Sequence, residues 1–183
     1  RKKFPVGSNF LVGVNIGPNK NSQDRFNDYK VLAENLSVFA DYISINVSSP
    51  NTPNLREFQK KENLEKVINF VKDGIARSKT LNKKLPIFLK IAPDINEQTL
   101  NSIIKTAHSQ KIFGLIISNT TVDRDRNLKS KKINEFGGLS GKPLFKKSTD
   151  ILSQANKLIK NNNYKLFLIA AGGVSDSETA YVK

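Results

Sequence analysis

The amino-acid sequence predicts an α/β fold built on a parallel sheet, and three observations lead to it. Five short apolar runs alternate with amphipathic stretches whose apolar residues recur at helical spacing. The runs are rich in Val, Ile and Leu and almost continuously apolar, which is typical of strands covered on both faces. Each run is followed by a helical stretch, and this alternation implies parallel strands joined by right-handed crossovers. A doubly wound sheet and part of a (β/α)8 barrel both satisfy the pattern.

The first two strands are predicted at residues 11–16 and 42–47. The first leads into a Gly-Pro-Asn turn, and the second leads into the polar string Ser48-Ser49-Pro50-Asn51-Thr52. Amphipathic helices are predicted over residues 25–38 and 64–75, where apolar side chains share one helical face. No G-x-G-x-x-G follows any strand, which argues against a dinucleotide-binding fold.

The third and fourth strands are predicted at residues 86–89 and 114–117. The third ends at Lys90, and the fourth ends at Ser118-Asn119-Thr120-Thr121. The connection over residues 122–136 is long, highly charged and poor in apolar residues. Such a segment is either a mobile surface loop or an active-site flap, because long loops at strand ends often act as lids.

The remaining elements complete five strand–helix units. A helix over residues 96–109 follows Asp94-Ile95-Asn96-Glu97, which we interpret as a capping box. A further helix is predicted around residues 150–159, before a last strand at 166–171 that ends in a glycine pair. Residues 175–178 are expected to cap one more helix at the end of the chain.

The composition is that of an ordinary globular chain of one domain. The 183 residues are 38% hydrophobic and 25% charged, and no apolar run is long enough to span a bilayer. There is no cysteine, so a thiolate nucleophile, a disulfide and a thiolate metal site are excluded within this chain. The single histidine, His108, falls on a polar helical stretch and is expected to be solvated, so no metal site is predicted.

The formal net charge of +14 leaves an alternative function open. A strongly basic protein can bind nucleic acid or an anionic membrane surface. However, the lysine pairs are scattered along the chain, and no aromatic residues interleave with them to stack bases. The charge is therefore also explained by Lys-rich helix faces in solvent.

The extent of the chain suggests a part of a larger fold. It begins with Arg1 and contains no methionine, so we expect an internal piece of a longer protein. A closed (β/α)8 barrel needs about 250 residues. Five units cut from such a barrel would leave strand edges bare, which is an aggregation liability.

Polar residues at the strand ends are the candidate functional groups, because active sites of parallel α/β folds lie there. Asn46 ends a strand, and Ser49 sits on a turn stiffened by proline. The string could also be a simple turn. Lys90 is either one half of a structural ion pair or a positive charge placed where negative charge develops. No Ser-His-Asp arrangement is available, so a serine here would act as a proton acceptor aided by neighbours or water.

Two glycine clusters suggest a phosphate-bearing ligand. Gly137-Gly138-Leu139-Ser140-Gly141 precedes a helix, and Gly172-Gly173 opens another. Bare backbone N–H groups at a helix start can cradle a phosphate. Together with the amide and hydroxyl groups, they describe a planar polar ligand with a phosphate tail.

Taken together, these strings resemble the dihydroorotate dehydrogenase family, in its quinone-linked class 2 branch. The resemblance runs in the family's order over nearly the whole chain. Class 1 relatives and dihydropyrimidine dehydrogenase resemble this fold but carry cysteine where Ser49 stands. The matching strings are Gly13-Val14-Asn15-Ile16-Gly17, Asn46 to Thr52, Leu89 to Asp94, Ser118 to Thr121, Gly137 to Leu144 and Gly172-Gly173-Val174.

The resemblance implies a (β/α)8 TIM barrel, of which residues 1–183 cover about five central βα units of a partial FMN-binding domain. It implies oxidation of dihydroorotate to orotate in pyrimidine synthesis, with electrons passing from FMN to a quinone. Another FMN-barrel reductase is the nearest alternative. It also implies no nucleic-acid partner, and peripheral attachment to a bacterial or mitochondrial inner membrane through a segment outside this chain.

The resemblance also assigns residue roles. Ser49 would be the base that removes the C5 proton, with Thr52 and a water as a relay, while hydride leaves C6. The substrate would be held by Asn46, Asn51, Asn119 and Thr120. The flavin would be contacted by Asn15, Asn46, Lys90, Ser118, Gly141 and Gly173.

Three departures from the family pattern stand in the chain. Ser118 replaces a usual threonine and keeps the hydroxyl. Asn54 replaces a common glycine, and asparagine tolerates the left-handed conformation better than most residues. Ala170-Ala171 stands where Gly-Val is common. The early strands, the last strand and the amphipathic helices that admit quinone are expected to lie outside this chain.

Overall fold

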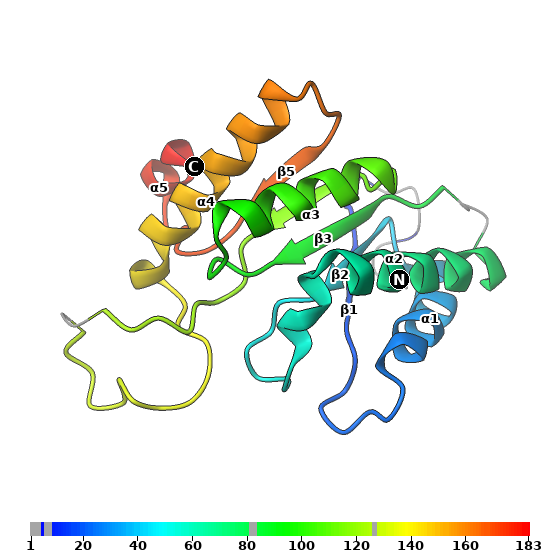
Figure 1. Ribbon diagram of the computed structural model, residues 1–183, viewed down its shortest axis with the longest axis horizontal. Helices are drawn as coiled ribbons and strands as arrows, with labels where there is room; N and C mark the ends of the chain where they lie inside the picture. The colour runs from blue at the N-terminus through cyan, green and yellow to red at the C-terminus, as the bar shows by residue number, and fades with distance from the viewer. Residues whose placement is uncertain (1–4, 6–8, 81–83, 126–127) are drawn as a thin grey trace.

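The protein is built on a five-stranded sheet in which every pairing is parallel and the strand order follows the chain. The computed structural model describes residue 5 and residues 9–80, 84–125 and 128–183. The predicted strands are confirmed in number and order (Figure 1). They are β1 (Gly13–Ile16), β2 (Tyr42–Asn46), β3 (Ile87–Ile91), β4 (Gly114–Ile117) and β5 (Phe167–Ala170).

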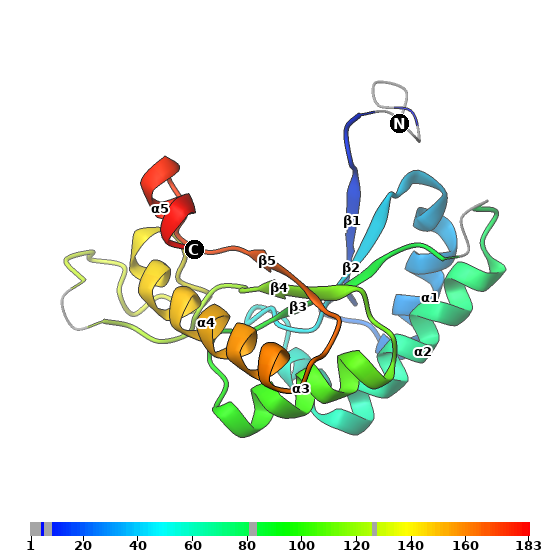
Figure 2. The same ribbon diagram turned by 90° about the horizontal axis from the view of Figure 1, so that it is seen from above.

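Helices separate the strands and cover one side of the sheet. Figure 2 shows a curved sheet with α1 to α4 on its convex side and β1 and β5 at its two edges. The helices are α1 (Arg25–Leu36), α2 (Lys61–Arg77), α3 (Glu97–Ser109), α4 (Phe145–Asn161) and α5 (Ser177–Val182), with short 3-10 turns η1 (Ser37–Phe39), η2 (Leu55–Gln59) and η3 (Lys142–Leu144).

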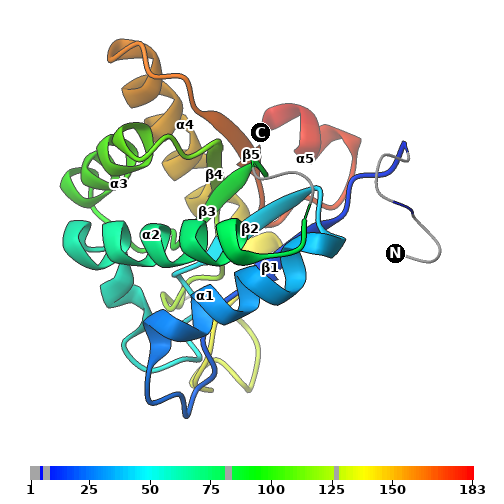
Figure 3. The same cartoon turned by 90° about the vertical axis from the view of Figure 1, so that its right-hand side faces the viewer.

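The core lies between the convex side of the sheet and these helices. Ile45 on β2, Leu89 on β3 and Ile117 on β4 point to this side and are completely buried. Their chain neighbours point to the other side, because side chains alternate along a strand. α1 and α2 pack side by side over one half of it (Figure 3). A glycine permits their close approach, because a Cβ at Gly74 would lie 2.3 Å from the Lys30 carbonyl oxygen.

The concave side of the sheet has a different character. Its register places Asn15 beside Ser44, and Asn46 beside Lys90. Toward the amino ends of the strands it carries an aromatic cluster, in which Phe113 and Phe167 stack at 4.7 Å. We predicted strands covered on both faces, and this is wrong for β5, where Phe167 is 62% exposed. The sheet is an open arc, so no further strands close over its concave side in the described part of the chain.

The helices differ from the prediction in caps and bounds, and α1 ends at Leu36 instead of residue 38. The cap of α3 is Asn96, whose Oδ1 accepts a hydrogen bond from the Thr99 amide at 2.9 Å. Asp94 does not cap this helix, because its carboxylate is held by residues from other loops. α4 begins at Phe145, earlier than the apolar spacing indicated, and the cap of α5 at Asp176 lies within the predicted string.

Candidate active site at the carboxyl ends of the strands

Asn46 ties the ends of β2 and β4 together. The Tyr29 hydroxyl donates to the Asn46 carbonyl at 2.7 Å and so anchors its backbone from α1. Burial raises the pKa of Tyr29 far above its ordinary value, so this hydroxyl stays a donor. The Asn46 side-chain oxygen accepts from the Asn119 amide at 3.1 Å. Two residues predicted to hold substrate are therefore in direct contact.

Ser48 is the buried centre of this network, and the sequence reasoning overlooked it. Its hydroxyl accepts from the Asn119 side chain at 3.0 Å. It lies 2.6 Å from the Lys90 carbonyl and 3.1 Å from Asn46 Oδ1. A hydroxyl carries one proton, so it donates to the nearer carbonyl oxygen. Ser48 thereby fixes the ends of β2, β3 and β4 relative to one another.

Ser49 lies next to this network and does not belong to it. The side chain is half-buried, and its Oγ accepts from the Asn51 amide at 3.3 Å. Ser48 is buried and Ser49 is only half-buried, so the Ser49 hydroxyl stays accessible at the surface of the turn. Thr52 is also half-buried and follows on the same loop.

A second loop packs against the turn that carries Ser49. A Cβ at Gly138 would lie 1.8 Å from Thr120 Oγ1 and 3.0 Å from Pro50, and a Cβ at Gly137 would lie 3.4 Å from Asn51 Oδ1. Only glycine fits at position 138. The candidate substrate residues Asn51 and Thr120 thus meet the glycine-rich loop that follows the charged connection.

Asn119 and Thr120 are held in fixed orientations. The Asn119 side-chain oxygen accepts from the Thr120 amide at 2.8 Å, while its NH2 group points to Asn46 and Ser48. Ser118 is buried, and its hydroxyl donates to the Asn119 carbonyl at 2.8 Å. The side-chain amide is therefore oriented before any ligand arrives.

Lys90 and Asn15 lie on the concave side of the sheet. The Asn15 side chain is exposed and accepts from the Ser44 hydroxyl at 3.1 Å. Lys90 is half-buried, and no carboxylate among residues 5, 9–80, 84–125 and 128–183 pairs with its ammonium. The structural ion pair considered for Lys90 is therefore not formed within these residues, and the positive charge faces the open side of the sheet.

The two glycine clusters meet at the start of α4. Gly141 and Gly173 have positive φ angles of 71° and 77°. A Cβ at Gly173 would lie 2.8 Å from the Gly141 carbonyl and 2.7 Å from Phe145 Cβ. Bare backbone is thus required at position 173. The clusters stand more than thirty residues apart in the sequence, yet they form one backbone surface beside the N-terminus of a 17-residue helix.

Charged residues behind the loops form a network that the sequence did not reveal. Arg56, on η2, pairs with Asp94 at 2.8 Å, and Lys147, on α4, pairs with Asp94 at 2.6 Å. Partial burial raises the pKa of Asp94, but hydrogen bonds from Lys147, Thr121, Val122 and Arg56 outweigh it and leave the pKa below its ordinary value. Asp94 is therefore a structural anion, where the sequence suggested a helix cap.

The long charged connection is closed at its base. Thr121 and Leu139 form an antiparallel bridge with hydrogen bonds of 3.1 and 2.7 Å. The Arg124 guanidinium donates to the carbonyls of Ile133, Glu135 and Gly137, at 3.1, 3.1 and 2.8 Å. The connection starts and ends beside the candidate substrate residues. Its role as a flap remains a prediction.

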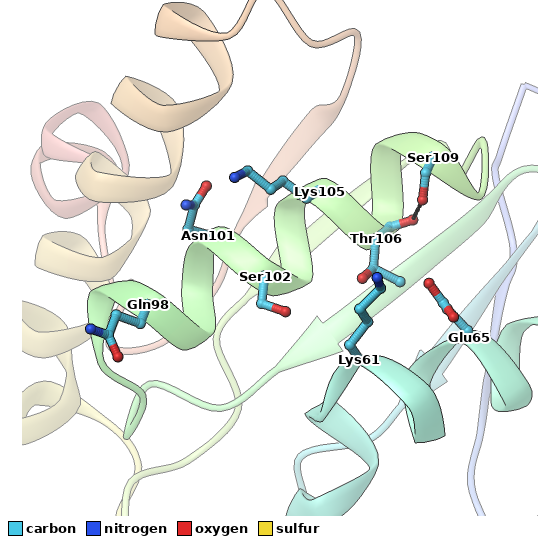
Figure 4. A pocket seen from close by; sticks show the side chains of 8 residues that line it. All are labelled: Lys61, Glu65, Gln98, Asn101, Ser102, Lys105, Thr106 and Ser109. Atoms are coloured by element: carbon cyan, nitrogen blue, oxygen red, sulfur yellow. Dashed lines mark hydrogen bonds between the residues drawn. The ribbon is translucent and has the colours of Figure 1, made fainter.

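A separate groove of about 600 Å³ lies between α2 and α3 (Figure 4). It is lined by polar side chains that include Lys61, Glu65 and Lys105. The groove belongs to the outer helix layer and contains none of the predicted site residues. The candidate active site is the strand-end edge.

A curved parallel sheet with helices on its convex side and polar groups at its carboxyl ends is the arrangement of an α/β barrel protein, a class whose active sites lie at that edge. The comparisons with known proteins agree. The family model described as dihydroorotate dehydrogenase matches residues 2–182. The chain belongs to the dihydroorotate dehydrogenase family.

Individual relatives support this assignment. A dihydroorotate dehydrogenase (quinone) of Agrobacterium fabrum is 44% identical over 94% of this chain, and one of Brucella abortus is 41% identical over 97%. Ligand-free DHODH from Eimeria tenella matches 94% of the chain with a TM-score of 0.85 and 32% identity. A DHODH structure in complex with ferulenol from the same organism matches with a TM-score of 0.83. The predicted partial (β/α)8 barrel is thereby confirmed.

The chain spans about half the length of these relatives, 47% of the Agrobacterium protein and 50% of the ligand-free Eimeria chain. In the described part of the chain, every helix is too short or too polar to cross a bilayer. The alternative of a basic binding protein for nucleic acid or an anionic membrane surface rested on net charge alone, whereas the family model matches residues 2–182.

Proposed function

We propose that this chain supplies the central part of a flavin-dependent active site that oxidises dihydroorotate to orotate in pyrimidine synthesis, with a quinone as final electron acceptor. The observation that carries the proposal is the hydrogen-bonded set of Asn46, Asn119 and Ser48 at the strand ends, beside Ser49, with Lys90 next to Asn46 in the strand register. Membership in the dihydroorotate dehydrogenase family supports it.

The residues present fit an FMN group. Gly141 and Gly173 bring side-chain-free backbone together next to a helix N-terminus, and this suits a phosphate. Lys90 offers a positive charge without a carboxylate partner among the described residues, and Asn15 and Asn46 offer amide groups on the same side of the sheet. We assign flavin contacts to these five residues and to Ser118. When bound, FMN supplies hydride acceptance from C6 and electron transfer to the quinone.

Ser49 removes the C5 proton in this proposal. Its Oγ accepts a hydrogen bond from the Asn51 amide, and that donor stabilises negative charge as it develops on the oxygen. The hydroxyl proton of Ser49 must leave as the C5 proton arrives, and Thr52 with a water molecule is its assigned relay.

Four side chains hold the substrate. Asn46 and Asn119 are joined by a side-chain hydrogen bond of 3.1 Å, and their remaining amide donors and acceptors can bind a planar ring. Asn51 and Thr120 approach from the two loops that meet at Gly137 and Gly138. Amide pairs suit a substrate that carries alternating carbonyl and N–H groups. The expected membrane contact is peripheral and belongs to a segment outside these residues.

The first test is Ser49→Ala in the intact protein. We expect the rate of flavin bleaching by dihydroorotate under anaerobic stopped flow to fall by roughly 10²–10⁴-fold, the usual cost of losing a positioned proton acceptor. Flavin content should stay the same, because Ser49 is not assigned to the flavin.

Ser153→Ala, on the exposed face of α4, is the matched control and should leave the rate unchanged. An unaltered rate in Ser49→Ala would remove this residue from the mechanism. Wild-type protein that binds FMN but is not bleached by dihydroorotate would reject the substrate assignment and favour another FMN-barrel reductase.

A further inference from the structure

Arg56 contacts three strand-end loops with three different nitrogen atoms. Nε donates to the Ser48 carbonyl at 3.2 Å, and one terminal nitrogen donates to the Thr120 carbonyl at 3.0 Å. The other terminal nitrogen donates to Asp94 at 2.8 Å. The loops after β2, β3 and β4 therefore share a single guanidinium group.

Asp94 binds Arg56 and also contacts the loop after β4 and helix α4. Its carboxylate accepts from Arg56, from the Thr121 hydroxyl and from the Val122 amide at 3.0 Å, and it pairs with Lys147 on α4. Lys147 also pairs with Asp123. Two cations face two carboxylates, so the network is neutral. The Asp94 side chain is only 11% exposed, which limits screening by solvent.

The positions of the bound carbonyls give this network a functional meaning. Ser48 precedes Ser49, the assigned proton acceptor. Thr120 and its neighbour Asn119 are the assigned substrate residues of the other loop. A group that binds the Ser48 and Thr120 carbonyls at once sets the spacing between the two loops.

We propose that Arg56 and Asp94 form a positioning clamp that fixes the Ser49 loop against the loop of Asn119 and Thr120. The clamp acts through other residues and does not touch the substrate. Its catalytic consequence rests on the function proposed above, whereas the coupling of the two loops does not. Asn54 adopts φ 58° immediately before η2, the 3-10 turn that carries Arg56.

The chemistry requires arginine at position 56. A guanidinium is planar and offers donors in fixed directions, whereas a lysine ammonium is a single point on a flexible stem. Lys at this position keeps the charge and the attraction to Asp94 but cannot bind both carbonyls in the same geometry. Arg56→Lys therefore separates positioning from charge.

The test compares Arg56→Lys and Asp94→Asn with Arg77→Lys in the intact protein. Arg77 also pairs with an aspartate, at 3.0 Å, but on the exposed side of α2. We measure the rate of flavin reduction at saturating dihydroorotate per bound flavin, well below the unfolding temperature. It should fall by about 10–100-fold in Arg56→Lys, since misplacement by about 1 Å has costs of this order. Asp94→Asn should lower it in the same direction, and Arg77→Lys should leave it unchanged.

Hydrogen–deuterium exchange supplies the second measurement. Amides of residues 47–53 and 118–122 should exchange faster together in Arg56→Lys, and at wild-type rates in Arg77→Lys. A residue that only stabilises the fold would lower the unfolding temperature and flavin yield without altering the rate per bound flavin.

The outcomes are distinct for the two proposals. Wild-type exchange in both loops of Arg56→Lys overturns the clamp, whatever the activity. Faster exchange with an unaltered rate per bound flavin overturns its catalytic role. Faster exchange in a protein whose wild type does not oxidise dihydroorotate supports the clamp and rejects the proposed function. If Arg56→Lys does not fold, Asp94→Asn is judged by the same two measurements.

Discussion

The two sides of the sheet use the same strands for different purposes. On the convex side, Ile45, Leu89 and Ile117 are completely buried under helices. On the concave side, Asn46 and Lys90 stay half-buried and keep polar groups available. Each polar residue is the chain neighbour of a core residue, because successive side chains of a strand point to opposite faces. Core residues and candidate site residues are therefore adjacent in the sequence but lie on opposite faces of the sheet.

The sharpest test of this comparison is the neighbouring pair Leu89 and Lys90. Leu89→Ala should lower the free energy of unfolding by about 2–5 kcal/mol, because it leaves a cavity in the core. The rate of flavin reduction per bound flavin should stay near wild type. Urea unfolding and stopped-flow reduction measure the two quantities.

Lys90→Met should give the reverse pattern. Losing the charge should slow flavin reduction by about 10²-fold and weaken FMN binding, while stability stays the same or rises because a partly buried cation is removed. Flavin titration and urea unfolding decide between the two patterns. The division of roles between the faces is wrong if Leu89→Ala abolishes catalysis at full flavin occupancy, or if Lys90→Met mainly unfolds the protein.

A smaller effect concerns pH and the network behind the loops. The folded-state pKa of Asp94 is below its ordinary value, so the carboxylate stabilises the fold above the unfolded-state pKa, about 3.9. That contribution is lost as pH falls through the folded-state pKa. Wild type should therefore lose stability on acidification over this range more steeply than Asp94→Asn. Thermal unfolding between pH 6 and pH 3 measures the slopes, and parallel slopes would contradict the role of Asp94 as a structural anion.

The smallest expected effect lies at Asn54. Its φ of 58° falls in the left-handed region, where a β-branched side chain is strained by roughly 1–2 kcal/mol. Asn54→Val should lower the free energy of unfolding by about this amount, and Asn54→Gly should change it little. Equal stability of the two variants would show that the turn into η2 does not need this conformation.

Much of the fold could be predicted from the sequence because its signals are local. The apolar strand runs and the helical spacing of α2 and α3 depend on neighbours within a few residues. Asn54 adopts the left-handed conformation that asparagine tolerates, at a position where the family commonly has glycine. The cap of α3 was misjudged, because Asp94 and Asn96 are both good caps and only distant partners of Asp94 exclude it.

The order of strands and helices, the polar strand ends and the family motifs that run through them could all be inferred from the residues alone. The burial of Ser48 beside an accessible Ser49, and the contact of Gly141 with Gly173, depend on the three-dimensional arrangement. So do the contacts of Arg56 with Asp94, 38 residues away, and with Thr120, 64 residues away. The physical reason is that helix and strand patterns arise from near neighbours, whereas loop contacts depend on how parallel strands bring distant segments to one edge.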